Sequence, residues 1–173
     1  MDEIRVVIFD WGETLMRDLG GYSGAMVSWP RVERMPGARA ALDALCGRFT
    51  CCVASNAGDS DAGMMGLALA RVGLRHYFDL LWTSRELGVN KPDPIFYERI
   101  LESLGAPAES CVMVGDSVNN DIRPAKEIGM RTVWLAAPGE EPAPSSDRTI
   151  HHLGDLPGVI DSLHGACDRD QGT

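Results

Sequence analysis

The run Ile4-Arg5-Val6-Val7-Ile8-Phe9, followed at once by Asp10, decides the fold predicted for this chain. Its residues are mostly β-branched and almost all apolar, which is typical of a parallel strand buried on both faces. Similar short runs predict strands over residues 50–54, 80–83, 111–114, 132–135 and 149–150. Helical patterns separate them, over residues 62–72, 121–128 and 156–163 and after the starts at Pro36-Gly37 and Asp93-Pro94. This alternation predicts an α/β fold with a doubly wound parallel sheet.

Polar residues stand where the predicted strands end, which is where ligands of a doubly wound sheet bind. Asp10, Ser55 and Asp116 follow predicted strands, Lys91 begins the turn into the helix that starts at Asp93-Pro94, and Asp121 begins the predicted helix over residues 121–128. Carboxylates gathered at one sheet edge repel one another and need a cation, and oxygen ligands without His or Cys suit Mg²⁺. A lysine and a hydroxyl beside them suit a phosphoryl group, and a carboxylate can act as the nucleophile. The residues therefore predict metal-assisted phosphoryl transfer.

Four motifs follow one another along the chain: Val-Ile-Phe-Asp10-Trp-Gly-Glu-Thr14-Leu, Val-Ala-Ser55-Asn56, Lys91-Pro-Asp-Pro-Ile-Phe-Tyr and Val-Gly115-Asp116-Ser117-Val-Asn-Asn-Asp121-Ile. Each is a weak signal alone. In this order and at strand ends, they resemble the haloacid dehalogenase superfamily over about residues 4–163. Most members of that superfamily are Mg²⁺-dependent phosphatases with a Rossmann-like sheet. The resemblance implies a phosphohydrolase that forms an aspartyl-phosphate on a small phosphorylated substrate.

The resemblance also implies a role for each matching residue. Asp10 would attack phosphorus, and Lys91 would neutralise the charge between Asp10 and the phosphoryl group. Ser55 and the amide of Asn56 would hydrogen-bond the transferred oxygens. Mg²⁺ would be held by Asp10, the main-chain carbonyl of Gly12 and Asp116, with Asp121 acting through water or by orienting Lys91. Thr14 would fix the loop after Asp10.

One position departs from the superfamily pattern. Its phosphatases usually carry a second Asp, the general acid and base, where this chain has Gly12. Loss of general acid catalysis costs about 10²–10⁴-fold, least for substrates with good leaving groups. Three explanations stay open: Glu13 supplies the proton, the substrate needs no acid, or the chain is a weak or inactive protein that binds or scaffolds a phospho-ligand. A phosphonatase is disfavoured because no Lys lies between Asp10 and Ser55, and a metal-free dehalogenase because Asp116 and Asp121 are retained.

The spacing of the motifs predicts one α/β domain over residues 1–164 without a cap domain. Only residues 16–35 are left over as an insert between the first two motifs, and the remainder, residues 165–173, is a polar tail. Within the insert, residues 19–29 are rich in Gly, Ser and aromatics, which suits a flap or an oligomer contact. Capless relatives act on bulky substrates or close the site with a neighbouring subunit, so a homo-oligomer is a further expectation.

Charge and composition narrow the choice of partners and compartment. Lys and Arg total 16 and Asp and Glu total 25, so the net charge is −9, which disfavours nucleic acid and acidic membranes as partners. No apolar run of about 18 residues and no signal-peptide pattern occurs. The five cysteines form no Cys-x-x-Cys pair, which argues against a zinc site and for a reduced, cytoplasmic setting.

Overall fold

The apolar, β-branched run at the start of the chain forms the central strand of a parallel sheet. We describe a computed structural model, which covers residues 3–165. Six strands form one sheet in the order β3-β2-β1-β4-β5-β6, and every neighbouring pair is parallel. They are β1 (Val6–Phe9), β2 (Thr50–Ser55), β3 (Leu80–Thr83), β4 (Cys111–Gly115), β5 (Arg131–Leu135) and β6 (Arg148–Ile150). The predicted doubly wound α/β fold is therefore confirmed.

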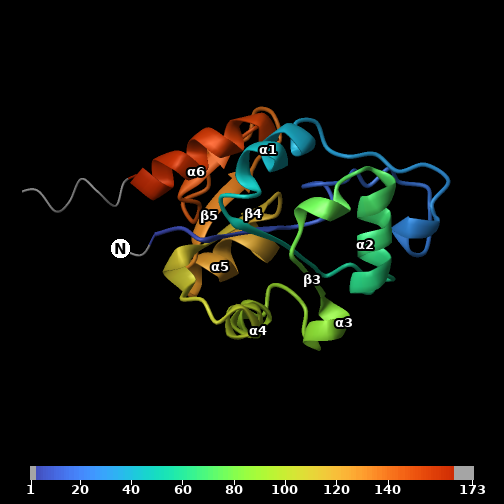
Figure 1. The fold of residues 1–173 in the computed structure, drawn as a ribbon, viewed down its shortest axis with the longest axis horizontal. Helices are drawn as coiled ribbons and strands as arrows, with labels where there is room; N and C mark the ends of the chain where they lie inside the picture. The colour runs from blue at the N-terminus through green and yellow to red at the C-terminus, as the bar shows by residue number, and fades with distance from the viewer. Residues whose placement is uncertain (1–2, 166–173) are drawn as a thin grey trace, which may run out of the picture.

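Helices cover both faces of this sheet, because alternate residues of β1 point to opposite sides (Figure 1). The helices are α1 (Ala38–Leu45), α2 (Ala62–Arg71), α3 (Ser84–Leu87), α4 (Pro94–Leu104), α5 (Arg123–Glu127) and α6 (Leu156–Gly165). Val7 and Phe9 pack with residues of α1, α2 and α6 in one apolar core. Val6 and Ile8 pack with residues of α3, α4 and α5 in the other.

Short polar residues set where the helices begin. The Asp61 side chain accepts a hydrogen bond from the amide of Met64 at the start of α2 (2.8 Å). Asp93 does the same for Ile95 at the start of α4 (3.0 Å), with Pro94 in the first helical position as predicted. These caps fix the direction in which each chain segment leaves the carboxyl edge of the sheet.

The predicted helix over residues 121–128 is wrong at its start. The helical segment begins earlier, with a π-helical turn over Val118–Ile122, and α5 follows directly. The Ser117 side chain accepts a hydrogen bond from the amide of Asn120 (3.2 Å), which fixes the beginning of the turn. The turn therefore lies at the end of β4 and places Asp121 inside the helical segment rather than at its first residue.

Residues 16–35 lie beside α2, and one 3-10 turn over Met26–Ser28 is their helical element. The guanidinium group of Arg71, at the end of α2, donates hydrogen bonds to the carbonyls of Val27 (2.9 Å), Trp29 (2.6 Å) and Pro30 (3.4 Å). Trp29 also packs against Tyr22, with ring centroids 5.6 Å apart. These contacts attach the insert to α2.

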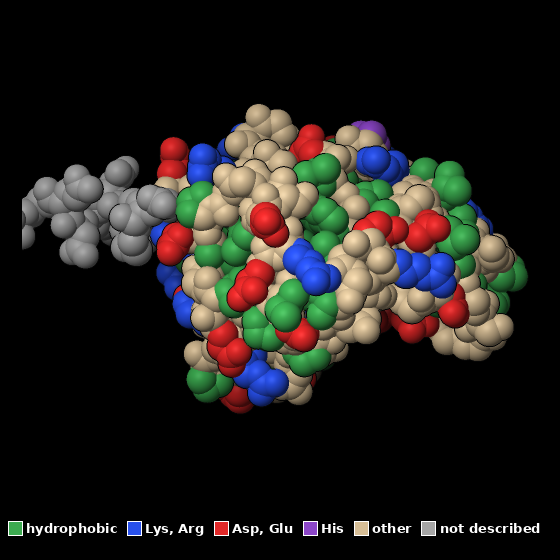
Figure 2. Space-filling view, turned by 90° about the horizontal axis from the view of Figure 1, so that it is seen from below, with side chains coloured by type: hydrophobic (Ala, Val, Ile, Leu, Met, Phe, Trp, Pro, Cys, Tyr) green, Lys and Arg blue, Asp and Glu red, His purple; other side chains and the backbone are tan. Residues whose placement is uncertain are grey.

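Two wider features concern the predicted partners. None of the helices in residues 3–165 is long and apolar enough to cross a membrane. On the face that carries α4, acidic and basic side chains of the described residues are interspersed and form no continuous basic patch (Figure 2). The predicted polar tail, apart from its first residue at the end of α6, lies outside the described residues.

Candidate active site

The seven residues predicted to bind substrate or metal or to act in catalysis line one cavity of about 240 Å³ at the carboxyl edge of the sheet. The sheet order reverses between β1 and β4, and it is at such a point that doubly wound folds bind ligands. Ser117 and Asn120 line the same cavity, although the sequence motifs gave them no role. The complete lining is Asp10, Gly12, Ser55, Asn56, Lys91, Asp116, Ser117, Asn120 and Asp121.

Lys91 is the buried cation of this cavity. Its ammonium group lies 2.9 Å from Oδ1 of Asp10 and 2.7 Å from Oδ1 of Asp121, and only 2 % of its side chain is exposed. Burial alone would lower the pKa of Lys91. The two carboxylates outweigh that effect and hold the pKa above its usual range, so the lysine is protonated. One positive charge is therefore fixed beside the Asp10 carboxylate.

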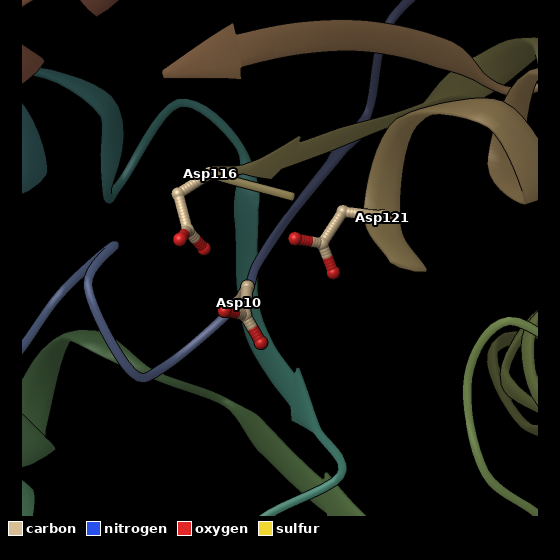
Figure 3. Close-up of side chains that lie close together, drawn as sticks. All are labelled: Asp10, Asp116 and Asp121. Atoms are coloured by element: carbon tan, nitrogen blue, oxygen red, sulfur yellow. The ribbon is translucent and has the colours of Figure 1, made fainter. Parts of the chain in front are cut away.

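Three carboxylates from separate segments lie close together, and two of them contact this lysine (Figure 3). Asp10 follows β1, Asp116 follows β4, and Asp121 comes from the π-helical turn. The hydroxyl of Thr14 lies 3.3 Å from Oδ1 of Asp116 and 3.5 Å from Oδ2 of Asp10, so it bridges two of them from the buried side. The indole N–H of Trp134 donates to the carbonyl of Asp116 (2.9 Å) and holds its main chain.

The raised pKa values of Asp116 and Asp121 show that the negative charge of these carboxylates is destabilised. Burial, and then repulsion from Asp10, raise the pKa of Asp116 to about 6. Burial also raises the pKa of Asp121, with Lys91 opposing the shift. One oxygen of each of the three residues lies within 4.8 Å of the others. Hard, like-charged oxygen donors at this separation fit Mg²⁺, which would relieve the repulsion.

Asp121 differs from the other two carboxylates because both of its oxygens already have partners. Oδ1 contacts Lys91, and Oδ2 accepts a hydrogen bond from the amide of Ser117 (3.1 Å). A Cβ at Gly115 would lie 2.3 Å from Oδ2 of Asp121, so the carboxylate occupies space that only a glycine leaves open. Of the two roles predicted for Asp121, the contacts favour orientation of Lys91.

Ser55 and Asn56, at the end of β2, also line the cavity. The Ser55 hydroxyl accepts a hydrogen bond from the amide of Ala57 (3.2 Å), and within residues 3–165 it serves only as an acceptor. Its own hydrogen is therefore available to a ligand in the cavity. The Asn56 side chain accepts from the amide of Lys91 (2.8 Å) and donates to the carbonyl of Lys91 (3.2 Å). Asn56 thus clamps the main chain that carries the buried lysine.

Tyr97 lies in α4, further along the chain from Lys91. This buried phenol donates a hydrogen bond to the carbonyl of Asn120 (2.6 Å) and joins α4 to the π-helical turn. Burial raises the pKa of Tyr97 above its usual range, so the phenol keeps its proton and acts as the donor. Neither Tyr97 nor the Asn56 clamp was assigned from the sequence, because each depends on partners more than 20 residues away.

Gly12 and Glu13 are the two positions that concern the general acid missing from the first motif. Gly12 lines the cavity, and a Cβ there would meet nothing within 4 Å. Glu13 is exposed and is not among the residues that line this cavity. Its carboxylate instead accepts a hydrogen bond from the amide of Asp18, at the start of the insert. The geometry therefore gives no support to Glu13 as the proton donor.

Comparison with known proteins agrees with this geometry. A family model described as haloacid dehalogenase-like hydrolase matches residues 29–129, more than half of the 173-residue chain. This chain belongs to the haloacid dehalogenase-like hydrolase family. The matched region contains the second, third and fourth motifs. The first motif, with Asp10, lies before it and is joined to the others by the sheet.

Several curated relatives of this haloacid dehalogenase-like hydrolase are phosphatases by name. The glyceraldehyde 3-phosphate phosphatase of Methanocaldococcus jannaschii is 40 % identical over 98 residues, which is 55 % of this chain and 43 % of that protein. The pyrimidine 5'-nucleotidase YjjG of Escherichia coli is 38 % identical over 130 residues, 73 % of this chain and 56 % of the relative. The chain spans about half the length of the curated relatives it matches.

Solved structures of similar size share the fold. An uncharacterised protein from Listeria monocytogenes serotype 4b has a TM-score of 0.80 at 26 % identity, covering 92 % of this chain and 98 % of that one. A haloacid dehalogenase-like hydrolase from Xanthomonas campestris has a TM-score of 0.75 at 19 % identity, covering 97 % and 99 %. The second likeness concerns the fold alone.

Proposed function

We propose that the protein is a Mg²⁺-dependent phosphohydrolase that forms an aspartyl-phosphate on Asp10. The observation that carries this proposal is the Asp10 carboxylate held 2.9 Å from a buried, protonated Lys91, in a cavity that also holds Asp116 and a free hydroxyl. The phosphatase names of several relatives support the same reaction. The substrate is a small phosphorylated molecule.

The residues of the cavity divide the work of binding the phosphoryl group. Ser55 donates its free hydroxyl hydrogen to a phosphoryl oxygen, with the Asn56 amide beside it. Lys91 neutralises charge that accumulates between Asp10 and the phosphoryl group. Asp10, Asp116 and the carbonyl of Gly12 would hold Mg²⁺, and Asp121 orients Lys91. When bound, Mg²⁺ supplies positive charge that shields the phosphoryl oxygens from the attacking carboxylate.

The reaction then takes two displacements. A carboxylate oxygen of Asp10 forms a bond to phosphorus as the bond from phosphorus to the leaving oxygen breaks. A water molecule donates a proton to the leaving oxygen, because position 12 has no carboxyl group, and the hydroxide that it becomes takes up the proton released in the second displacement. A water molecule next attacks the phosphorus of the aspartyl-phosphate, which releases inorganic phosphate and regenerates Asp10. The absence of an acid at Gly12 makes esters with good leaving groups the best substrates.

None of residues 16–35, the short insert, lines the candidate active site. We propose that the chain works without a cap domain, as a single α/β domain over residues 1–164. Because Arg71 attaches the insert to α2, a second subunit is the more suitable cover for the site. A homo-oligomer is therefore part of this proposal.

Gly12 also favours a second candidate function. A chain that binds a phospho-ligand without turning it over would retain Lys91, Ser55 and the metal-binding carboxylates but would need no proton donor. Such a binding or scaffolding protein is stabilised by the ligand through mass action and shows no turnover.

One experiment separates these two functions. Hydrolysis of p-nitrophenyl phosphate is measured with Mg²⁺ and with EDTA in the wild type, in Asp10→Asn and in the exposed control Asp155→Asn. This leaving group needs little protonation, so the missing acid does not mask the nucleophile. An enzyme shows Mg²⁺-dependent turnover that is lost only in Asp10→Asn. Absence of turnover together with stabilisation by inorganic phosphate would instead indicate a binding protein.

A further inference from the structure

A second cavity of about 410 Å³ adjoins the candidate active site, and we call it the outer pocket. Asp116 lines both cavities, and the adjacent residues Gly12 and Glu13 line one each. The outer pocket lies where β5 ends, between the loop after β1 and the segment before β6. It is lined by Glu13, Met35, Asp116, Leu135, Ala136, Ala137, Pro138, Glu140 and His151.

The volumes of the two cavities indicate how a substrate divides between them. Sites that bury a small organic molecule occupy about 300–1,000 Å³. The candidate active site, at about 240 Å³, is smaller than this range and is lined almost entirely by groups suited to a phosphoryl group and a cation. The remainder of a phosphate ester must therefore lie outside it. The outer pocket begins at Asp116, which lines both cavities, and at Glu13, the neighbour of Gly12.

The polar groups of the outer pocket are hydrogen-bond acceptors. Glu13 and Glu140 are exposed carboxylates, each with one oxygen that accepts a main-chain N–H, from Asp18 and Ala137 respectively. No Lys or Arg from residues 3–165 lines this pocket. Its charge is therefore negative, which is unfavourable for a second anionic group on the substrate.

His151 adds a further acceptor. Its Nδ1 lies 3.3 Å from the carbonyl of Ala136 and 3.2 Å from the carbonyl of Ala137. Carbonyl oxygens only accept hydrogen bonds, so Nδ1 carries the hydrogen and, in the neutral ring, Nε2 is the acceptor. Met35, Leu135 and Pro138 supply the apolar part of the lining. The pocket therefore combines carbon surface with groups that receive hydroxyl or ammonium hydrogens.

We propose that the outer pocket binds the organic group of the substrate and, among phosphate monoesters with equally reactive leaving groups, favours those whose organic group carries a hydroxyl or ammonium and lacks a second anion. This inference rests on the proposed phosphatase function and narrows its substrate class. A terminal hydroxyl or ammonium donates to Glu13, Glu140 or Nε2 of His151. A terminal carboxylate or second phosphate meets the two glutamates as a like charge.

The test compares two esters that differ at one end of the molecule, sn-glycerol 3-phosphate and D-3-phosphoglycerate. We expect the wild type to have a kcat/KM about tenfold or more higher for the glycerol ester, and phosphoethanolamine to be accepted as well. Glu13→Gln and Glu140→Gln each lower this preference about threefold, because an amide keeps the main-chain hydrogen bond and removes the charge. The control is Glu141→Gln, an exposed neighbour that does not line the pocket and leaves the preference unchanged.

The outcomes separate this inference from the function on which it rests. Equal turnover of the two esters, or a wild-type preference for D-3-phosphoglycerate, overturns the outer pocket as the selecting element, provided that p-nitrophenyl phosphate is hydrolysed in a Mg²⁺-dependent way. An unchanged preference in both glutamine variants overturns it too. Where the two esters are turned over too slowly, their inhibition constants against p-nitrophenyl phosphate give the same comparison. Absence of all turnover overturns the proposed function, and this inference with it.

Discussion

The two edges of the sheet offer a direct comparison between buried and exposed charge. The edge where the strands begin carries the larger cavity, about 610 Å³, lined by residues such as Arg48, Asp79 and His164. There Arg48 pairs with Asp161, and about half of each side chain is exposed. At the opposite edge the cavity is smaller, but Lys91 and Asp121 are each 2 % exposed. Buried charge, rather than cavity size, marks the edge that can do chemistry.

The physical reason lies in the cost of removing charge from water. An exposed ion pair gains little, because water already solvates both partners. A buried lysine has little water around it, so its two carboxylate partners stabilise its charge. The pKa of Asp116 nearby is raised, so binding of an additional cation by the carboxylates is favourable. The following predictions test this difference between the edges, beginning with the largest expected effect.

Replacement of the buried cation tests the comparison most strongly. Lys91→Met leaves Asp10 and Asp121 buried without their partner, so we expect a loss of about 3–5 kcal/mol in the free energy of unfolding. Turnover of p-nitrophenyl phosphate falls by at least about 10³-fold. Urea unfolding and initial rates measure both effects. The matched variant Arg48→Met loses at most about 1 kcal/mol, and an equal loss of stability in the two variants would contradict the comparison.

Restoration of an acid tests why the carboxyl edge lacks one. A Cβ at position 12 would meet nothing within 4 Å, so Gly12→Asp introduces no clash at that atom. We expect kcat for sn-glycerol 3-phosphate to rise about 10²-fold, because its alkoxide leaving group needs a proton. The gain for p-nitrophenyl phosphate is much smaller. Gly12→Asn has the same shape without the acid and gives no such rise; a similar rise in both variants would exclude proton donation as the cause.

The clamp on the lysine main chain tests how accurately the buried charge must be placed. Asn56→Ala removes both hydrogen bonds to Lys91 while leaving the ammonium group present. We expect kcat for p-nitrophenyl phosphate to fall about tenfold, since small displacements of a catalytic group are costly. KM changes less than kcat. The exposed Asn119→Ala is the control, and a full rate in Asn56→Ala would show that the clamp does not position Lys91.

The pH dependence of stability tests the repulsion among the carboxylates. The pKa of Asp116 is raised to about 6 by burial and by Asp10, against about 3.9 in an unfolded chain. The folded, metal-free protein therefore holds a proton that the unfolded chain releases. Its free energy of unfolding should gain a contribution from Asp116 as the pH falls from about 6 to about 4.

Urea unfolding in EDTA across this range measures the effect as the difference between wild type and Asp116→Asn. The Asp161→Asn variant, at the opposite edge, keeps the wild-type slope. Saturating Mg²⁺ reverses the sign for the wild type, because protons and the cation compete for the same oxygens. A slope in EDTA that is identical in wild type and Asp116→Asn would contradict the raised pKa.

The two edges also differ in what the sequence could predict. The first strand was predicted from Ile4 and begins at Val6, and the other strands were predicted within about one residue. This was possible because a buried parallel strand needs an unbroken apolar run such as Val6–Phe9. The positions of Asp10, Ser55 and Asp116 followed, since each directly ends or follows a strand. All seven predicted residues do line one cavity.

Features that depend on distant contacts were not predictable in this way. The Asn56 side chain finds its partner 35 residues away, and Arg71 binds carbonyls more than 40 residues before it. The outer pocket joins segments near residues 13, 35, 136 and 151, which share no motif. The start of the helical segment after β4 was wrong because a π-helical turn leaves no periodicity that differs from an ordinary loop followed by a helix.

That π-helical turn makes the site sensitive to chain length at one point. It holds Asp121 against Gly115 and Lys91 by accommodating more residues than an α-helical turn would. Deletion of a single residue between Ser117 and Asp121 would turn the carboxylate by about 100° around the helix axis. Among otherwise similar sequences, the spacing between Ser117 and Asp121 therefore indicates whether the carboxylate is placed to contact Lys91.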